Sequence, residues 1–173
     1  MEQQAEPAIF SEEQHFTQPW LWLLIVLMTV AVILPLGAVI LNPGQTFSFR
    51  AGNGFSVLIG PVICMGIIIL FAKLKLITSV NSQGIFVQVK SFHRQPIFFD
   101  FRDIKEYATR TYRPIIEYGG WGIKRGIGRL AYNVSGKQGL QLVLTDGRKI
   151  LIGTQKPEQL INAINSAGKI KRI

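Results

Sequence analysis

Two long stretches without a charged residue constrain this chain most. Residues 20–41 form a run of 22 uncharged residues, and residues 55–72 form a second run of 18. As α-helices rising about 1.5 Å per residue, they would reach roughly 33 and 27 Å, close to the ~30 Å hydrocarbon core of a bilayer. We therefore predict two transmembrane helices. The alternative is a buried core hairpin of a soluble protein.

Aromatic and basic residues stand at the ends of these runs. Trp20 and Trp22 open the first run, and Lys73 and Lys75 follow the second. Tryptophan is enriched at the membrane–water interface, and long lysine side chains extend their charged ends toward it. We predict that these four residues are membrane-interface anchors.

Charge is distributed unevenly along the chain. Residues 1–18 carry four acids and no Lys or Arg, whereas residues 73–173 carry 18 of the 19 Lys and Arg and six acids. Basic residues favour the cytoplasmic side of a membrane. We predict an acidic cytoplasmic tail over 1–18, a helical hairpin over 19–75, and a cytoplasmic domain over 76–173. The protein would be a multi-pass protein of the plasma (inner) membrane with both termini in the cytoplasm.

Short β-prone runs separated by turn signals dominate the sequence after residue 75. Asp146-Gly147 is a strong tight-hairpin signal. Pro157 suits the first turn of a helix, and apolar residues follow it at helical spacing. The pattern predicts a mainly β fold, an antiparallel sandwich or barrel closed by one C-terminal helix. About seven strands are expected, at 76–80, 85–90, 97–99, 105–111, 130–134, 140–144 and 149–152.

Three segments carry a resemblance to a known family. They are the expected hairpin over 77–89, the stretch PIFFDFRDI over 96–104, and TDGRKILIGTQKPEQLINAI over 145–164. In this order they resemble the bacterial pleckstrin-homology-like (PH-like) domain, which often follows one or two membrane helices. The resemblance covers about residues 74–167. It implies a PH-like fold that acts as a scaffold or binding module rather than as an enzyme.

A glycine-rich segment supplies the best functional residues. Trp121, Lys124, Arg125 and Arg129 combine one aromatic with three cations between Gly119 and residue 129. They could contact anionic lipid headgroups, with Trp at the interface and the cations on phosphates. They could also form a Trp/Arg hot spot for a protein partner. The third alternative is a structural loop whose Trp packs on the domain.

No residue pattern indicates catalysis. His15 and His93 have no second ligand at metal spacing, and the glycines near Trp121 lack the Lys-Ser/Thr of a phosphate-binding loop. The acids Asp100, Asp103 and Glu106 have basic neighbours, so a solvated mixed-charge turn is expected there. We expect no catalytic residues, metal, cofactor or small-molecule substrate.

These observations lead to one functional hypothesis and one alternative. The first is a non-enzymatic integral membrane protein, bacterial in style, that presents a basic domain for protein assembly or anionic-lipid contact at the inner membrane. Its partners would be membrane lipids and a protein, including a second copy of itself. The alternative is a subunit or regulator of a membrane enzyme or transporter complex. Nucleic acid is not expected, because the cations are not interleaved with stacking aromatics.

Overall fold

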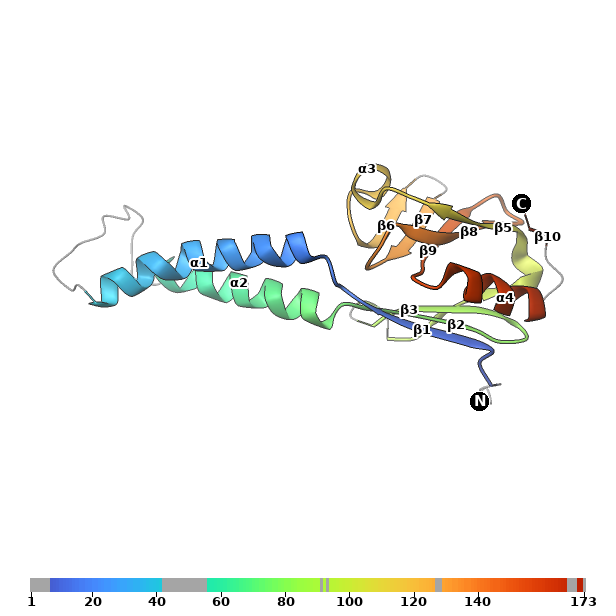
Figure 1. The fold of residues 1–173 in the computed structure, drawn as a ribbon, viewed down its shortest axis with the longest axis horizontal. Coiled ribbons are helices and arrows are strands. Elements are labelled where there is room, and N and C mark those ends of the chain that lie inside the picture. The colour runs from blue at the N-terminus through green and yellow to red at the C-terminus, as the bar shows by residue number, and fades with distance from the viewer. Residues whose placement is uncertain are drawn as a thin grey trace. The chain divides into compact units, whose positions relative to one another are not determined.

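The chain folds into two compact units in the computed structural model (Figure 1). The structure describes residues 7–41, 56–90, 92, 94–126, 129–167 and 171–172, without the side chains of 35, 36, 38–40, 56–58 and 171–172. The helical unit is Thr17–Ala72. The strand unit combines Met1–Phe16 with Lys73–Ile173. We describe each unit by itself.

Two helices make up the helical unit, α1 (Pro19–Leu41) and α2 (Ser56–Lys73). They approach closely at Gly60, where an added Cβ would lie 2.9 Å from Cγ1 of Val32. Ile25 and the single cysteine, Cys64, are buried. Other large apolar side chains of both helices are exposed, among them Leu23, Leu27, Leu34, Val62 and Met65.

The predicted membrane anchor is contradicted by the described helices. Among the residues that the structure describes, none of the helices combines the length and the apolarity needed to cross a membrane. The spans at 20–41 and 55–72, the multi-pass inner-membrane location and the topology inferred from them are therefore corrected.

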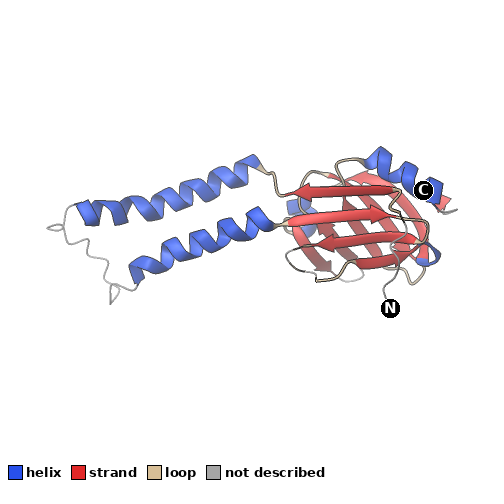
Figure 2. Ribbon diagram, turned by 90° about the horizontal axis from the view of Figure 1, so that it is seen from below, coloured by secondary structure: helices blue, strands red, loops and turns tan. Residues whose placement is uncertain are grey.

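A four-stranded antiparallel sheet forms the first layer of the strand unit (Figure 2). Its strands follow the order β1-β2-β3-β4. Buried and more accessible residues alternate along β1 and β2, as expected for a sheet with one face on a core. The bounds are β1 Phe10–His15, β2 Lys75–Val80, β3 Gly84–Val89 and β4 Ile97–Asp100.

The first strand comes from the segment expected to be an acidic tail. β1 pairs with β2 along its whole length, from Phe10↔Val80 to His15↔Lys75. The helical unit is therefore inserted between two neighbouring antiparallel strands. Strand β1 was missed because five of its six residues are polar and its partner residues lie 60 to 70 positions away in the chain.

A six-stranded sheet forms the second layer, in the order β10-β5-β8-β9-β7-β6. Two of its pairings are parallel, β7 with β9 and β10 with β5, so the expected all-antiparallel arrangement is wrong. The bounds are β5 Ile104–Thr111, β6 Gly122–Gly126, β7 Arg129–Asn133, β8 Gln138–Leu144, β9 Lys149–Gly153 and β10 Lys171–Arg172.

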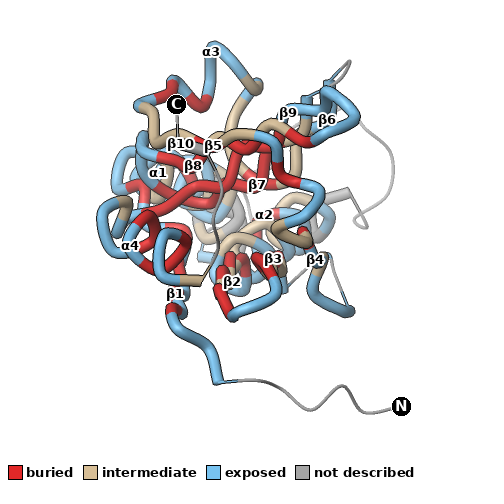
Figure 3. Tube along the Cα trace, turned by 90° about the vertical axis from the view of Figure 1, so that its right-hand side faces the viewer, coloured by how far each residue is buried: buried red, intermediate tan, exposed pale blue. Residues whose placement is uncertain are grey.

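The hydrophobic core lies between the sheets and against α4 (Pro157–Ala167) (Figure 3). Across the layers, the rings of Phe99 and Tyr132 have centroids 6.4 Å apart. Helix α4 contacts β1, β2 and β8 and buries its apolar face, and Asn165 accepts a hydrogen bond from the Tyr107 hydroxyl. Fully buried core residues include Leu76, Ile85, Leu140, Leu142, Ile150, Ile152, Leu160 and Ile164.

A connection crosses the face of the six-stranded sheet opposite to this core. Three strands separate β5 from β6, so the chain must pass over the sheet between them. It does so through the short helix α3 (Pro114–Tyr118), which ends at Gly119 in the left-handed conformation (φ 69°, ψ 21°). Tyr112 and Tyr118 of this connection pack with Ala131 and Leu151 of the sheet. This second small core is absent from the sequence-based expectation.

The local predictions for the strand unit had mixed outcomes. The hairpin β2–β3, the hairpin β8–β9 at Asp146-Gly147 and the helix beginning at Pro157 are confirmed. The count of seven strands is wrong, since the described residues form ten, with β1, β6 and β10 added. Residues 101–104 form a 3-10 turn (η1, Phe101–Asp103) leading into β5.

Candidate anion-binding pocket

The first half of the candidate site comes from the β6–β7 hairpin. Gly122, with φ at 108°, lets the connection from α3 turn into β6, a backbone conformation that residues with a Cβ rarely adopt. The two strands pair with Arg125 opposite Leu130 and Gly126 opposite Arg129. Arg125 and Arg129 therefore come together at the end of this hairpin.

The second half comes from the tight turn between β8 and β9. Gly147 has φ at 84°, and the Asp146 carboxylate accepts a hydrogen bond from the Arg148 backbone N–H at 2.9 Å. The Leu144 N–H donates to the Arg148 carbonyl at 2.9 Å, which closes the hairpin. The turn places Arg148 and Lys149 at the start of β9.

Parallel pairing brings the two hairpins together. β7 and β9 run in the same direction with Arg129 opposite Lys149 and Leu130 opposite Ile150. Their first residues therefore lie at the same end of the sheet. A pocket of about 380 Å³ opens there, lined by Arg125, Gly126, Arg129, Leu130, Arg148, Lys149 and Ile150. Four of these seven residues are basic and none is acidic.

The cations of this basic pocket are poorly neutralised. Nε of Arg148 lies 2.5 Å from the Asp146 carboxylate. Among the described residues, no salt bridge is formed by Arg125, Arg129 or Lys149. Glu106 lies in the same register row as Lys149, but β8 separates them, which corresponds to about 10 Å. The pocket is therefore a local excess of positive charge.

The pKa of the neighbouring Tyr132 is affected by cations of the pocket. Burial raises the pKa of Tyr132, because a phenolate loses hydration inside the protein, while the charges of Arg125 and Arg148 act in the opposite direction. Cations from both hairpins thus act on one buried residue.

A second pocket illustrates what balanced charge looks like. It has a volume of about 450 Å³ and is lined by Ser82, Gln83, Asp100, Phe101, Arg102 and Ala167. Its one cation and one anion bind each other, with Nη2 of Arg102 2.6 Å from the Asp100 carboxylate. This arrangement lowers the pKa of Asp100 to about 2. The basic pocket differs because most of its cations have no such partner.

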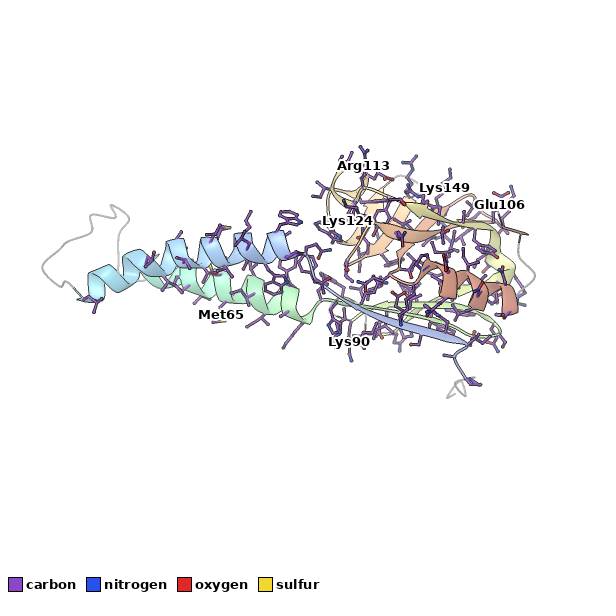
Figure 4. All side chains as sticks on the ribbon, viewed as in Figure 1. Met65, Lys90, Glu106, Arg113, Lys124 and Lys149 are labelled. Atoms are coloured by element: carbon purple, nitrogen blue, oxygen red, sulfur yellow. The ribbon has the colours of Figure 1, made fainter. Side chains whose placement is uncertain are left out.

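Of the four residues predicted for lipid or partner contact, two line the basic pocket and two lie elsewhere. Arg125 and Arg129 line the basic pocket. Lys124 points to the other side of β6 from Arg125, opposite Ala131 of β7. The Trp121 ring packs edge-on against Phe16, with centroids 6.0 Å apart and planes at 88°. Figure 4 labels Lys124 and Lys149 on the strand unit.

The residues predicted as interface anchors fall in different elements. Trp20 is half exposed and, like Trp22, lies in the first turn of α1, whereas Lys73 ends α2. Lys75 belongs to β2, and its Nζ lies 2.6 Å from the Glu13 carboxylate of β1. The Lys75 hydrogen bond is the main cause that lowers the pKa of Glu13. Lys75 thus joins the two strands at the point where the helical unit is inserted.

Two residues of the pocket, Arg148 and Lys149, were missed by the sequence analysis. The Asp146-Gly147 turn signal placed them next to a hairpin, but no local pattern showed that β9 pairs with β7. Only this long-range pairing joins them to Arg125 and Arg129.

Other kinds of site find no support in the described part of the chain. No group of three or more His, Cys, Asp or Glu side chains is placed there to hold a metal ion. Comparisons with protein families, curated proteins and solved structures find no match to this chain. The resemblance to bacterial PH-like domains therefore stays a prediction.

Proposed function

We propose that the strand unit is a non-catalytic binding module that takes the phosphate-bearing headgroups of anionic lipids into its basic pocket. The observation that carries this proposal is the group of four cations around one depression, three of them without a salt bridge among the described residues. Guanidinium groups match phosphate oxygens through paired N–H donors, and a lysine adds a point charge. An anionic headgroup would neutralise the charge that the protein leaves unpaired.

The form of the pocket favours a headgroup over a nucleic acid strand. Proteins that hold single strands align cations along a groove together with aromatic platforms for the bases. Here the cations gather at the ends of two hairpins, and the apolar residues of the lining are aliphatic, Leu130 and Ile150. Trp121, next to the opposite end of β6 from the pocket, packs against Phe16. A compact anionic group fits this arrangement.

This proposal concerns contact with a lipid surface by the strand unit and does not require a spanning helix. It keeps the expectation of a binding module, as the PH-like resemblance implies. Assembly with a protein partner or a second copy is the competing outcome. The experiments below are chosen so that lipid contact is observed at the pocket itself.

Chemical footprinting of lysines tests the proposal locally. The full-length chain is mixed with vesicles of a zwitterionic lipid or with vesicles containing anionic lipid, and amine acylation is mapped by mass spectrometry. Lys149 should be protected by anionic vesicles only. Lys137, which is exposed and outside the pocket, is the internal control. Equal reactivity of Lys149 in both vesicle types would refute lipid contact at this pocket.

Charge-matched variants test the same point by affinity. The triple variant Arg125→Gln, Arg129→Gln, Lys149→Gln should bind anionic vesicles at least about tenfold more weakly, since each basic residue near such a surface contributes about 1 kcal/mol. The control Lys90→Gln, Lys137→Gln, Lys156→Gln removes the same charge from exposed positions outside the pocket. If both triple variants lose the same affinity, the attraction comes from net charge and not from the pocket.

A further inference from the structure

Two large apolar side chains stand exposed on the connection that crosses the six-stranded sheet. Ile115 and Ile116 of α3 are 55% and 75% exposed. They are adjacent in the chain. In the same helix Pro114 is buried and Tyr118 half-buried, whereas Glu117 is exposed. Exposing two isoleucine side chains to water is unfavourable. Burying them against a binding partner would therefore contribute favourable free energy to binding.

A hydrogen-bond network holds α3 firmly in this position. The Arg110 guanidinium of β5 donates to Glu117 at 2.7 Å and to the Tyr118 hydroxyl at 2.8 Å. It also donates to Gln141 of β8 at 3.1 Å. The other oxygen of Glu117 accepts from the Arg113 backbone N–H at 2.7 Å. The isoleucine pair is therefore presented by a fixed helix.

The same face of the sheet carries cations of the basic pocket. Arg129 and Lys149 each lie two residues before Ala131 and Leu151, over which α3 is packed, so all four side chains share one face. Arg113, exposed, immediately precedes α3. Figure 4 shows Arg113 and Lys149 on the same side of the strand unit. The single acid of α3, Glu117, is occupied by Arg110.

We infer that Ile115 and Ile116 form an apolar wedge that enters the acyl boundary of the anionic lipid surface held by the basic pocket. This inference rests on the proposed function and adds a second contribution to it. Charge complementarity selects the occupant: the cations beside the wedge favour an anionic surface, and a lipid surface offers an apolar layer directly beneath its charged groups. Apolar insertion together with basic residues is the usual combination by which peripheral segments bind membranes.

A polarity-sensitive fluorophore on the wedge provides the direct test. It is attached to Ile116→Cys in a full-length chain that also carries Cys64→Ser, since Cys64 is the single cysteine. Anionic vesicles should move its emission to shorter wavelength, because the probe enters an apolar layer, and zwitterionic vesicles should not. The same fluorophore on Lys137→Cys should keep its emission unchanged in both.

Affinity of the unlabelled chain gives a second measurement. Ile115→Ser with Ile116→Ser should weaken binding to anionic vesicles by about tenfold, and the loss should persist at high salt, because apolar burial is not screened. The control Ile9→Ser with Phe92→Ser changes two exposed apolar residues outside α3 and should keep the affinity.

The outcomes separate the two proposals. Protection of Lys149 without an emission shift at residue 116 would overturn the wedge and leave the pocket standing. If anionic vesicles do not protect Lys149, the proposed function is overturned, and the wedge with it. An emission shift that depends on protein concentration without vesicles would mean that the isoleucines dock on a second copy, which also overturns the wedge.

Discussion

Two places in the strand unit handle ionisable side chains in opposite ways. Glu12 on β1 is 4% exposed, and its carboxylate accepts hydrogen bonds from the Thr154 hydroxyl at 2.6 Å and the Gln155 backbone N–H at 2.7 Å. The cations of the basic pocket are surface residues, and three of the four form no salt bridge among the described residues.

The comparison separates a structural role from a binding role. Polar groups that are removed from water must be satisfied within the protein, or they cost free energy. Glu12 meets this condition and joins the N-terminal strand to the turn before α4. Unpaired surface cations are satisfied by water, so they add little to folding and stay available to a ligand. We therefore expect Glu12 to govern stability and the pocket to govern binding.

The largest expected effect is on Glu12. Glu12→Ala removes the acceptor of two hydrogen bonds inside the protein, which should lower the free energy of unfolding by about 3 kcal/mol. Glu12→Gln keeps a carbonyl oxygen for the Gln155 N–H and an amide that can donate to the Thr154 hydroxyl, so it should lose about 1 kcal/mol or less. Urea unfolding of the full-length chain, followed by near-ultraviolet circular dichroism, measures both.

Equal losses in these two variants would contradict this assignment, because hydrogen bonding would then not be the reason for the buried position. A loss in Glu12→Ala no greater than that of an exposed control, Glu158→Ala in the first turn of α4, would also contradict it.

The second effect is smaller and opposite in sign. Arg125→Gln with Lys149→Gln should leave the free energy of unfolding unchanged or raise it by up to about 0.5 kcal/mol, because two like charges are removed from one pocket. The same unfolding measurement at low and high salt checks the reason, since any gain should shrink as salt screens repulsion. A loss above about 1 kcal/mol would mean that these side chains support the fold.

The smallest effect concerns an exposed ion pair. The hydrogen bond from Arg102 lowers the pKa of Asp100 from an ordinary value of 3.8 to about 2. A pKa that is lower in the folded state gives stability above the unfolded value and loses it as pH falls toward the folded value. Between about pH 4 and pH 2, the original chain should therefore lose slightly more stability than Asp100→Asn. Parallel slopes in unfolding measurements at pH 5, 4, 3 and 2 would contradict this.

Local features of the fold could be predicted because short-range chemistry determines them. The hairpin at Asp146-Gly147 and the helix beginning at Pro157 follow from turn and helix-start preferences within a few residues. By contrast, α3 lies in a stretch for which the sequence predicts neither a helix nor a strand. Its stability depends on Tyr112 and Tyr118 covering Ala131 and Leu151, contacts that no local pattern reveals.

Half of the candidate pocket could be predicted, for the same reason. Arg125 and Arg129 stood out because they are close together in a basic, glycine-rich segment. Lys124 was grouped with them, but it does not line the pocket: alternation along β6 puts it on the other face from Arg125, opposite Ala131. Arg148 and Lys149 join the pocket only through the parallel pairing of β7 with β9.

The sequence by itself determined the apolar runs, the excess of basic charge after residue 72 and the positions of the tight turns, because these depend on composition and on neighbouring residues. Tertiary structure alone decided that residues 10–15 complete a sheet with 75–80 and that Glu12 is buried. It alone also gathered the cations of two hairpins into one pocket. The physical reason is that sheet register is set by long-range hydrogen bonding and by burial of one face, which only the folded chain defines.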